Sequence, residues 1–221
     1  MRENREKQKE RTHLSHCPVL NTYVLGFLPA DLDNRVILDV GCGFGDWGFF
    51  IRTRKSGVPY LIGLDIWRPY LEKVCLLKVY DDLIRVKLPQ IPLKEKSVDI
   101  SLACEILEHL PKSDGYELLR ELERVTREMV VASAPLNLPQ GEIHGNPFQK
   151  HISEWLPKDF TRYGYETEIV HFLPKTLRFA DKIRRFIFKL PPTPRLIVAR
   201  KLIGRESEST ERGCTGRNST I

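Results

Sequence analysis

Residues 36–46 read Val-Ile-Leu-Asp-Val-Gly-Cys-Gly-Phe-Gly-Asp, a short apolar run followed by three closely spaced glycines. The apolar run at 36–40 is typical of a buried strand. Residues 47–54 are expected to form a helix that Gly57 can end. Glycine permits positive φ angles and lets a ligand approach the backbone closely. This order of strand, glycine loop and helix predicts a ligand site at the carboxyl end of a parallel sheet.

The alternation of strand and helix continues along the chain. Further strands are expected over residues 60–65, 83–86, 98–103, 129–133, 166–172 and 196–200, and helices over 69–79, 115–127 and 156–163. Pro135 is expected to stop the strand at 129–133. Several strands are apolar throughout, which suits a parallel sheet covered on both faces. The pattern therefore predicts a doubly wound α/β fold.

A single domain is expected over residues 13–203. Residues 1–12 are nearly all polar, and residues 204–221 are rich in Ser, Thr, Gly and charge, so we expect both ends to be disordered. The N-terminus does not resemble a secretory signal, and no apolar run approaches the length of a spanning helix. The irregular stretch from Pro135 to about Ser153 is a candidate substrate loop.

The composition is that of an ordinary globular protein with a small excess of positive charge. The formal net charge is +6, which modestly favours an anionic partner, but so small an excess is common and the preferred interpretation is a solvated surface without a specific partner. No two of the five cysteines form a Cys-x-x-Cys pair, so we expect reduced cysteines, no disulfide framework and no metal site. A cytoplasmic location follows from this cysteine usage.

The glycine spacing distinguishes between ligand classes. A dinucleotide fingerprint reads G-x-G-x-x-G, whereas the third glycine here, Gly45, comes one residue early and is followed by Asp46. Asp39 and Asp46 make the loop mildly acidic, which suits a ligand with a cationic centre. No Gly-Lys-Ser/Thr follows, so a phosphate-binding P-loop is excluded. A nucleotide-dependent oxidoreductase is therefore disfavoured.

Asp65 stands at the end of the strand expected over residues 60–65. A carboxylate at this position can accept hydrogen bonds from the two hydroxyls of a ribose. The alternative is that Asp39 and Asp65 only cap turns or helices. The glycine loop, the acid at the strand end and the alternating strands together favour an adenosyl ligand.

With these residues the sequence resembles the class I S-adenosylmethionine-dependent methyltransferases, most closely the type 11 methyltransferase-domain group. The resemblance runs from about residue 36 to residue 164. It implies a Rossmann-like, doubly wound and mostly parallel seven-stranded sheet with an antiparallel strand near the C-terminus. The matching stretches are residues 36–45, Gly63-Leu64-Asp65, residues 91–100, Glu105-Ile106-Leu107-Glu108-His109-Leu110, residues 121–125 and Pro135.

The resemblance also implies S-adenosylmethionine as the cofactor and a role for each matching residue. Asp39 and the backbone of Gly41, Cys42, Gly43 and Gly45 would hold the methionine part. Asp65 would hold the ribose, and Ile66 would lie against the adenine. Lys87 and Leu88 would lie beside the edge of the adenine ring. Cys104 and Glu105 would line the part of the site that holds the methyl-donating end of the cofactor. The family usually places an acid where Lys87 stands here; Asp81 and Asp82 come too early.

Few residues are candidates for a catalytic role, because the cofactor itself carries the reactive methyl group. A general base is needed only if the methyl acceptor must lose a proton. Glu108 and His109 follow the strand at 98–103, and His144 and His151 flank the long loop. We predict Glu108, His109 and His151 as catalytic residues. The alternatives are a structural pair at a helix start and loop-stabilising histidines. Phe148 and Trp155 are candidates for an aromatic wall or for simple packing.

Residues 175–190 combine apolar positions at helical spacing with six interleaved Lys and Arg residues. Such a basic amphipathic helix can lie on an anionic membrane, bind a partner or bind nucleic-acid phosphates, or it can simply cover a sheet edge. The predicted activity is methyl transfer to a small-molecule or lipid-like acceptor. Two alternatives stay open: an RNA or protein methyltransferase, and a non-catalytic cofactor-binding subunit. The sequence predicts no oligomeric state.

Overall fold

Six strands of a seven-stranded sheet run in one direction, and the seventh, β7, runs against them. The computed structural model describes residues 18–143, 145–171, 177–178, 182–183, 187 and 195–204. The strand order is β3-β2-β1-β4-β5-β7-β6, with β7 antiparallel to both of its neighbours. The strands are β1 (Val36–Val40), β2 (Tyr60–Asp65), β3 (Asp82–Arg85), β4 (Val98–Cys104), β5 (Thr126–Leu136), β6 (Glu166–His171) and β7 (Arg195–Leu202). The predicted Rossmann-like fold with its antiparallel strand is confirmed.

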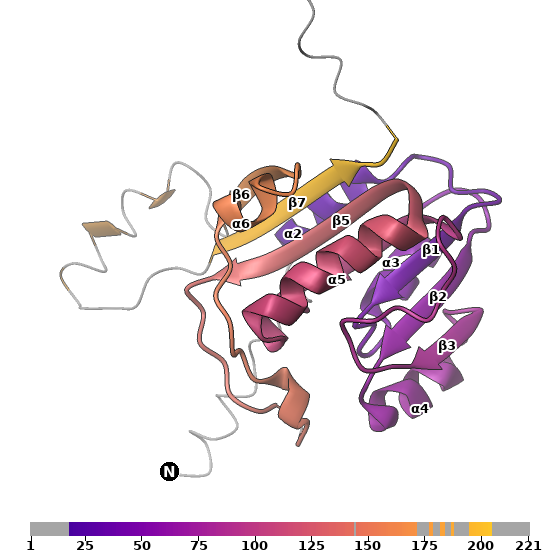
Figure 1. Ribbon diagram of the computed structural model, residues 1–221, viewed down its shortest axis with the longest axis horizontal. Coiled ribbons are helices and arrows are strands. Elements are labelled where there is room, and N and C mark those ends of the chain that lie inside the picture. The colour runs from indigo at the N-terminus through magenta and orange to yellow at the C-terminus, as the bar shows by residue number, and fades with distance from the viewer. Residues whose placement is uncertain are drawn as a thin grey trace, which may run out of the picture.

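Helices cover both faces of the sheet, as Figure 1 shows for α5 in front of it and α2 and α3 behind it. The helices are α2 (Pro18–Phe27), α3 (Asp46–Arg54), α4 (Arg68–Leu77), α5 (Lys112–Val125) and α6 (Pro157–Thr161), with short 3-10 turns η2 (Leu107–His109) and η3 (Pro147–Gln149). No helix among the described residues is long and apolar enough to cross a membrane.

Two apolar cores lie on opposite faces of the sheet because side chains alternate along each strand. In β1, Ile37 packs into the core under α2, α3 and α4, whereas Leu38 and Val40 pack into the core under α5. Trp155 and Phe160 extend the second core and are almost fully buried. Trp155 therefore contributes to packing, the second of its two predicted roles.

The structure differs from the sequence prediction at β5, which continues through Pro135 to Leu136. The pairing of β5 with β4 ends at Ser133, opposite Cys104, whereas Pro135 still pairs with Leu196 of β7. Beyond Ser133, β5 pairs with only one of the described strands. A proline is tolerated there because the backbone N–H that it lacks has no ladder partner on the open side.

The helix α2 was not predicted. Its residues are mostly apolar, and its first turn has no acidic residue to mark a helix start. Leu20 and Val24 are fully buried, and the helix packs against β6 and β7. Tertiary packing rather than local capping therefore stabilises this helix.

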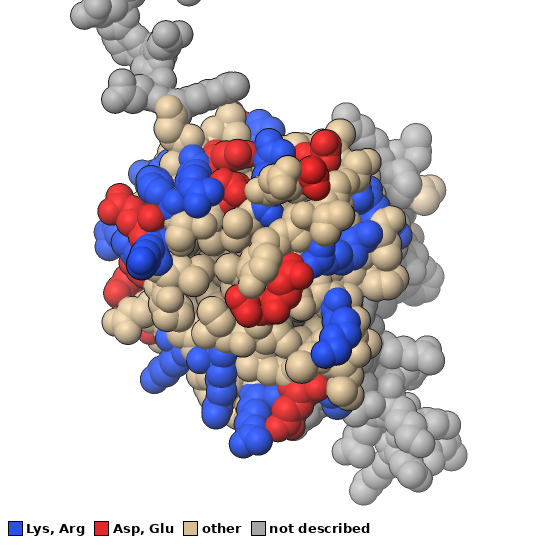
Figure 2. Space-filling view, turned by 90° about the vertical axis from the view of Figure 1, so that its right-hand side faces the viewer, with Lys and Arg blue, Asp and Glu red and all other residues tan. Residues whose placement is uncertain are grey.

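Side chains of both charges are interspersed on the side that lies at the right of Figure 1, where β3 is the edge strand. Figure 2 shows this side, with Lys and Arg groups separated by Asp, Glu and uncharged residues. On this described surface the basic groups do not form the continuous stripe that phosphate backbones favour. The predicted segment 175–190 lies largely outside the described residues, as do the two predicted disordered ends.

Candidate functional site

Three glycines shape the loop between β1 and α3. Gly41, Gly43 and Gly45 all have positive φ angles, of 78°, 51° and 88°. The backbone N–H groups of Gly41 and Cys42 both donate to the carbonyl of Leu64, at 2.8 Å. The loop is thereby tied to the end of β2, and its backbone lines a cavity at the carboxyl edge of the sheet.

The carboxylate of Asp65 is held by the backbone on both of its oxygens. The N–H of Gly43 donates to Oδ2 at 3.0 Å, and the N–H of Trp67 donates to Oδ1 at 2.7 Å. Burial raises the pKa of Asp65, and these backbone hydrogen bonds oppose the rise. Each oxygen keeps a further lone pair, so this oriented carboxylate can still accept two hydrogen bonds from a ligand.

Two cavities with different linings meet at Gly41 and His109. The first, of about 290 Å³, is mainly apolar, and we call it the apolar cavity. The second, of about 70 Å³, is more polar, and we call it the polar cavity. Asp65, Ile66, Val86, Lys87, Leu88 and Phe148 line the apolar cavity; Cys42, Gly43, Asp46, Tyr70, Cys104 and Glu105 line the polar one.

A third cavity of about 420 Å³ adjoins the polar cavity, with which it shares Glu108 and His151. We call it the outer cavity. Its other lining residues come from the end of β5 and from the long loop, namely Pro135, Asn137, Leu138, Pro139, Ile152, Ser153 and Glu154. The predicted substrate loop therefore forms the wall of a space beside the polar cavity.

Glu105 faces the polar cavity from the end of β4 and has a positive φ angle of 55°. The Ser133 hydroxyl donates to one carboxylate oxygen at 2.7 Å. The other oxygen, Oε2, is buried and has no hydrogen-bond partner among the described residues. Burial raises the pKa of Glu105 to about 7, against the effect of the Ser133 hydrogen bond. A buried acceptor without a partner is costly unless a ligand group meets it.

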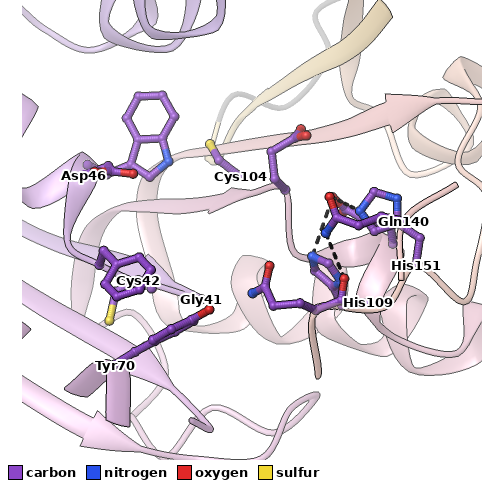
Figure 3. Close-up of a pocket in the computed structure, with 14 residues that line it drawn as sticks. Gly41, Cys42, Asp46, Tyr70, Cys104, His109, Gln140 and His151 are labelled. Carbon is purple, nitrogen blue, oxygen red and sulfur yellow. Dashed lines mark hydrogen bonds and ion pairs between the residues drawn. The ribbon is translucent and has the colours of Figure 1, made fainter. Parts of the chain in front are cut away.

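His109 and His151 lie at one end of the polar cavity, with Asp46 at the other end (Figure 3), and Glu108 forms a compact group with the two histidines. The Nε2 atoms of His109 and His151 lie 4.0 Å and 3.9 Å from the same oxygen, Oε1 of Glu108. All three side chains are more than nine-tenths buried. Burial raises the pKa of Glu108 well above its usual range and lowers the pKa of His151.

Most of the residues predicted to bind the cofactor line one of the first two cavities, but Asp39 and Gly45 do not. Asp39 lies behind the glycine loop, where its carboxylate accepts a hydrogen bond from the Tyr80 hydroxyl. Gly45 packs against Val74, and a Cβ atom there would lie 2.4 Å from that side chain. Both residues therefore support the loop from outside the cavities. His144 lies outside the described residues.

The acids near β3 do not face the apolar cavity. Asp81 forms an ion pair with Arg52 at 2.6 Å, and Asp82 accepts a hydrogen bond from Tyr60 at 2.8 Å. Instead, Asp114 in the first turn of α5 lines this cavity. Asp114 was not predicted, because it follows β4 whereas the acid was expected just after β3. Tyr70, Gln140 and Gln149 of the polar cavity were not predicted either.

Asp39 gives the stability of the protein a specific pH dependence. Burial raises its pKa to about 7; the Tyr80 hydrogen bond lowers it, and the charges of Asp65 and Asp46 raise it. An unfolded aspartate has a pKa of about 3.9. The folded protein therefore holds this proton more tightly, and the free energy of unfolding falls as pH rises between these two values.

Asp39→Asn is expected to remove this contribution, because the amide does not titrate and can still accept from Tyr80. Between about pH 4 and about pH 7, unfolding free energies from denaturant titrations should fall less steeply for the variant than for the wild type. Glu105 titrates in both proteins, so the difference between the two slopes isolates Asp39. Equal slopes would show that the Asp39 carboxyl does not carry a raised pKa.

Comparisons with known proteins agree with this geometry. Residues 38–131 match the model of a family described as a methyltransferase domain. A search of the curated proteins finds no matching sequence.

Solved structures with low sequence identity share the fold. An S-adenosylmethionine-dependent methyltransferase from Mesorhizobium loti is 18% identical, with a TM-score of 0.55 over 81% of this chain and 96% of that one. A chain in the complex of the Haloferax volcanii Trm112 methyltransferase activator with a methyltransferase is 17% identical, with a TM-score of 0.58 over 88% and 92%.

Magnesium protoporphyrin IX methyltransferase from Synechocystis PCC 6803, solved with bound S-adenosylmethionine, is 12% identical, with a TM-score of 0.53 over 87% of this chain and 80% of that one. The family match covers the glycine loop, Asp65 and the Glu105–His109 stretch, which line parts of the apolar and polar cavities. Through residues 38–131 the chain is therefore similar to the methyltransferase-domain family, and it shares its fold with solved structures of S-adenosylmethionine-dependent methyltransferases.

Proposed function

We propose that this chain binds S-adenosylmethionine across the two cavities that meet at Gly41 and His109, and transfers its methyl group to an acceptor in the outer cavity. The observation that carries the proposal is the pairing of an apolar cavity with a polar one at the glycine loop. An adenosyl ligand has an apolar heteroaromatic end and a charged amino-acid end. The apolar cavity suits the heteroaromatic end, and the polar cavity suits the amino-acid end.

The residues of both cavities suit the chemical groups of this cofactor. Ile66, Val86 and Leu88 offer apolar contacts for a base, and Asp65 offers two oriented oxygens for a ribose diol. In the polar cavity, the unpartnered Oε2 of Glu105 suits the positive charge of an ammonium or sulfonium group. Lys87 stands in the place of an acid on the adenine side, and Asp114 provides a carboxylate in the same cavity.

Bound S-adenosylmethionine supplies a methyl group that is reactive because it is carried on a sulfonium. The residues of this chain mainly hold the donor and the acceptor in line, and such positioning lowers the barrier of a displacement substantially. The glycine loop and Asp65 fix the donor side. Because Glu108 and His151 line both the polar and the outer cavity, they lie where donor and acceptor would meet.

The proposed acceptor is a small or lipid-like molecule. Pro135, Leu138, Pro139 and Ile152 give the outer cavity an apolar component, and its size of about 420 Å³ is within the range of small-molecule sites. The mixed charge of the face in Figure 2 does not favour a nucleic-acid acceptor. Contact of residues 175–190 with an anionic membrane stays a prediction.

Calorimetry with S-adenosylmethionine and with its demethylated product tests the cofactor half of the proposal. We expect saturable binding of one molecule per chain at micromolar to millimolar concentration. No binding of either compound by folded protein at millimolar concentration would contradict it.

Incubation with methyl-labelled cofactor and fractionated cell extract tests the acceptor half. Label is expected in the small-molecule or lipid fraction. Label in RNA or protein would assign the chain to a different acceptor class. Cofactor binding without label in any fraction would favour a non-catalytic subunit.

A further inference from the structure

Three potential metal ligands converge at the boundary between the polar and outer cavities. One donor atom from each of Glu108, His109 and His151 lies within 4.8 Å of the other two. The sequence predicted no metal site, because His151 follows His109 by 42 residues and Glu108 by 43, and no ligand spacing marks them. The long loop after β5 brings His151 back to η2, where the backbone N–H of Ile152 donates to the carbonyl of Glu108 at 2.8 Å.

Both imidazoles are oriented by backbone carbonyls. Nδ1 of His151 lies 2.6 Å from the carbonyl oxygen of Leu138, and Nδ1 of His109 lies 3.2 Å from that of Lys150. A carbonyl only accepts, so each Nδ1 carries the proton and donates. A neutral imidazole then presents its lone pair at Nε2, which in both residues is directed towards Glu108. Metal-ligating histidines are fixed by outer partners in this way.

Glu108 completes the group with a carboxylate that lacks a visible partner. The residue is 2% exposed, and neither carboxylate oxygen accepts a hydrogen bond from another described residue. Its separations of 3.9 Å and 4.0 Å from the two Nε2 atoms are too long for hydrogen bonds. Ligands about 2 Å from one ion are themselves about 3–4 Å apart, so these gaps lie at the upper end of that range, and the side chains would move slightly inwards to hold an ion between them.

We propose that Glu108, His109 and His151 bind a divalent first-row transition metal ion such as Zn²⁺ or Mn²⁺. Two imidazole nitrogens and one carboxylate oxygen form a donor set that such ions accept while keeping a position open. Glu108 and His151 also line the outer cavity, so the open position faces the space assigned to the acceptor. An oxygen atom of water or of the acceptor is the ligand expected there.

This assignment gives the three residues a role other than proton transfer. A general base has to direct its basic atom at the acceptor. Here both Nε2 atoms are directed at one buried carboxylate instead. The position of the ion relative to the acceptor rests on the proposed function, but the binding of the ion does not, because all three ligands belong to this chain.

Metal binding can be measured on the full, untagged chain without S-adenosylmethionine. After chelator treatment and dialysis, calorimetric titrations with Zn²⁺, Mn²⁺ and Co²⁺ are expected to give one ion per chain, and the Co²⁺ form is expected to absorb visible light. Thermal midpoints should rise with the concentration of free ion. Because the cofactor is absent, failure of this test leaves the proposed cofactor site untouched.

Two single variants test the ligand assignment. Glu108→Gln and His151→Gln are each expected to weaken binding by more than the roughly 10–100-fold caused by loss of an outer partner of a ligand. His171→Gln, which removes an imidazole from β6, and Glu72→Gln, which removes an exposed carboxylate, are matched controls expected to keep wild-type affinity.

Wild-type protein that takes up none of the three ions at millimolar concentration would overturn the proposal. So would ion binding that survives unchanged in both ligand variants. If the variants do not fold, ¹⁵N-histidine couplings in the electron paramagnetic resonance of the Mn²⁺- or Cu²⁺-loaded wild type replace them. Two coupled histidines are expected, and none would contradict the assignment.

Discussion

Asp65→Ala is expected to weaken S-adenosylmethionine binding by at least about 100-fold, or roughly 3 kcal/mol or more. Hydrogen bonds to a charged group contribute about 1.5–3 kcal/mol each, and the variant removes the carboxylate proposed to accept two from the ribose. It also releases the N–H of Gly43, which donates to Asp65 at 3.0 Å and helps to hold the glycine loop. Both losses act on bound cofactor in the same direction. Calorimetry with S-adenosylmethionine measures the change.

Asp82→Ala is the matched control for this experiment. Asp82 is an exposed acid on the neighbouring strand β3, and its carboxylate accepts from Tyr60 rather than from the loop. We expect wild-type cofactor affinity for it. Wild-type affinity in Asp65→Ala, with an unchanged thermal midpoint, would remove Asp65 from the ribose site.

Gly45→Ala is expected to lower the free energy of unfolding by about 2–5 kcal/mol. The φ angle of 88° at this position costs a non-glycine residue roughly 1–2 kcal/mol. In addition, the new Cβ atom would lie 2.4 Å from Cγ2 of Val74, and overpacking of a buried contact costs about 1–3 kcal/mol. Denaturant titration measures the loss.

The double variant Gly45→Ala/Val74→Ala separates these two causes. It removes the contact with Val74 but not the backbone strain, so its unfolding free energy should exceed the value expected from adding the two single losses. Gly141→Ala is the control, because no atom lies within 4 Å of its expected Cβ position and its φ angle is not positive. Strict additivity of the two substitutions would show that the Val74 contact is not the source of the loss.

The sequence predicted the centre of the fold well, because local signals there agree with one another. The bounds of β1 and β2 are confirmed to the residue, and α3 begins one residue earlier than predicted. Each of these strands is a short apolar run, and the residues on either side of it mark where the strand begins and ends. The cofactor-site residues that were predicted follow strand ends, where a parallel sheet gathers them on one edge.

Other features could not be predicted because distant parts of the chain create them. The strand β5 passes Pro135 because β7 pairs with it over that length, and α2 forms against β6 and β7. Likewise, the approach of His151 to Glu108 depends on the path of a long irregular loop. No sequence periodicity encodes the path of this loop. The sequence therefore predicted the catalytic candidates one by one but not that they lie close together.

The position of β7 has a consequence for folding during synthesis. The ribosome makes β7 after β6, yet β7 lies between β5 and β6 and is the only described strand that β6 pairs with. Until residues 195–202 emerge, β6 cannot join the sheet and β5 keeps an open edge, which is a template for pairing with other chains. The nascent protein therefore passes through an interval in which five aligned strands are complete but their last edge is still open to misassembly.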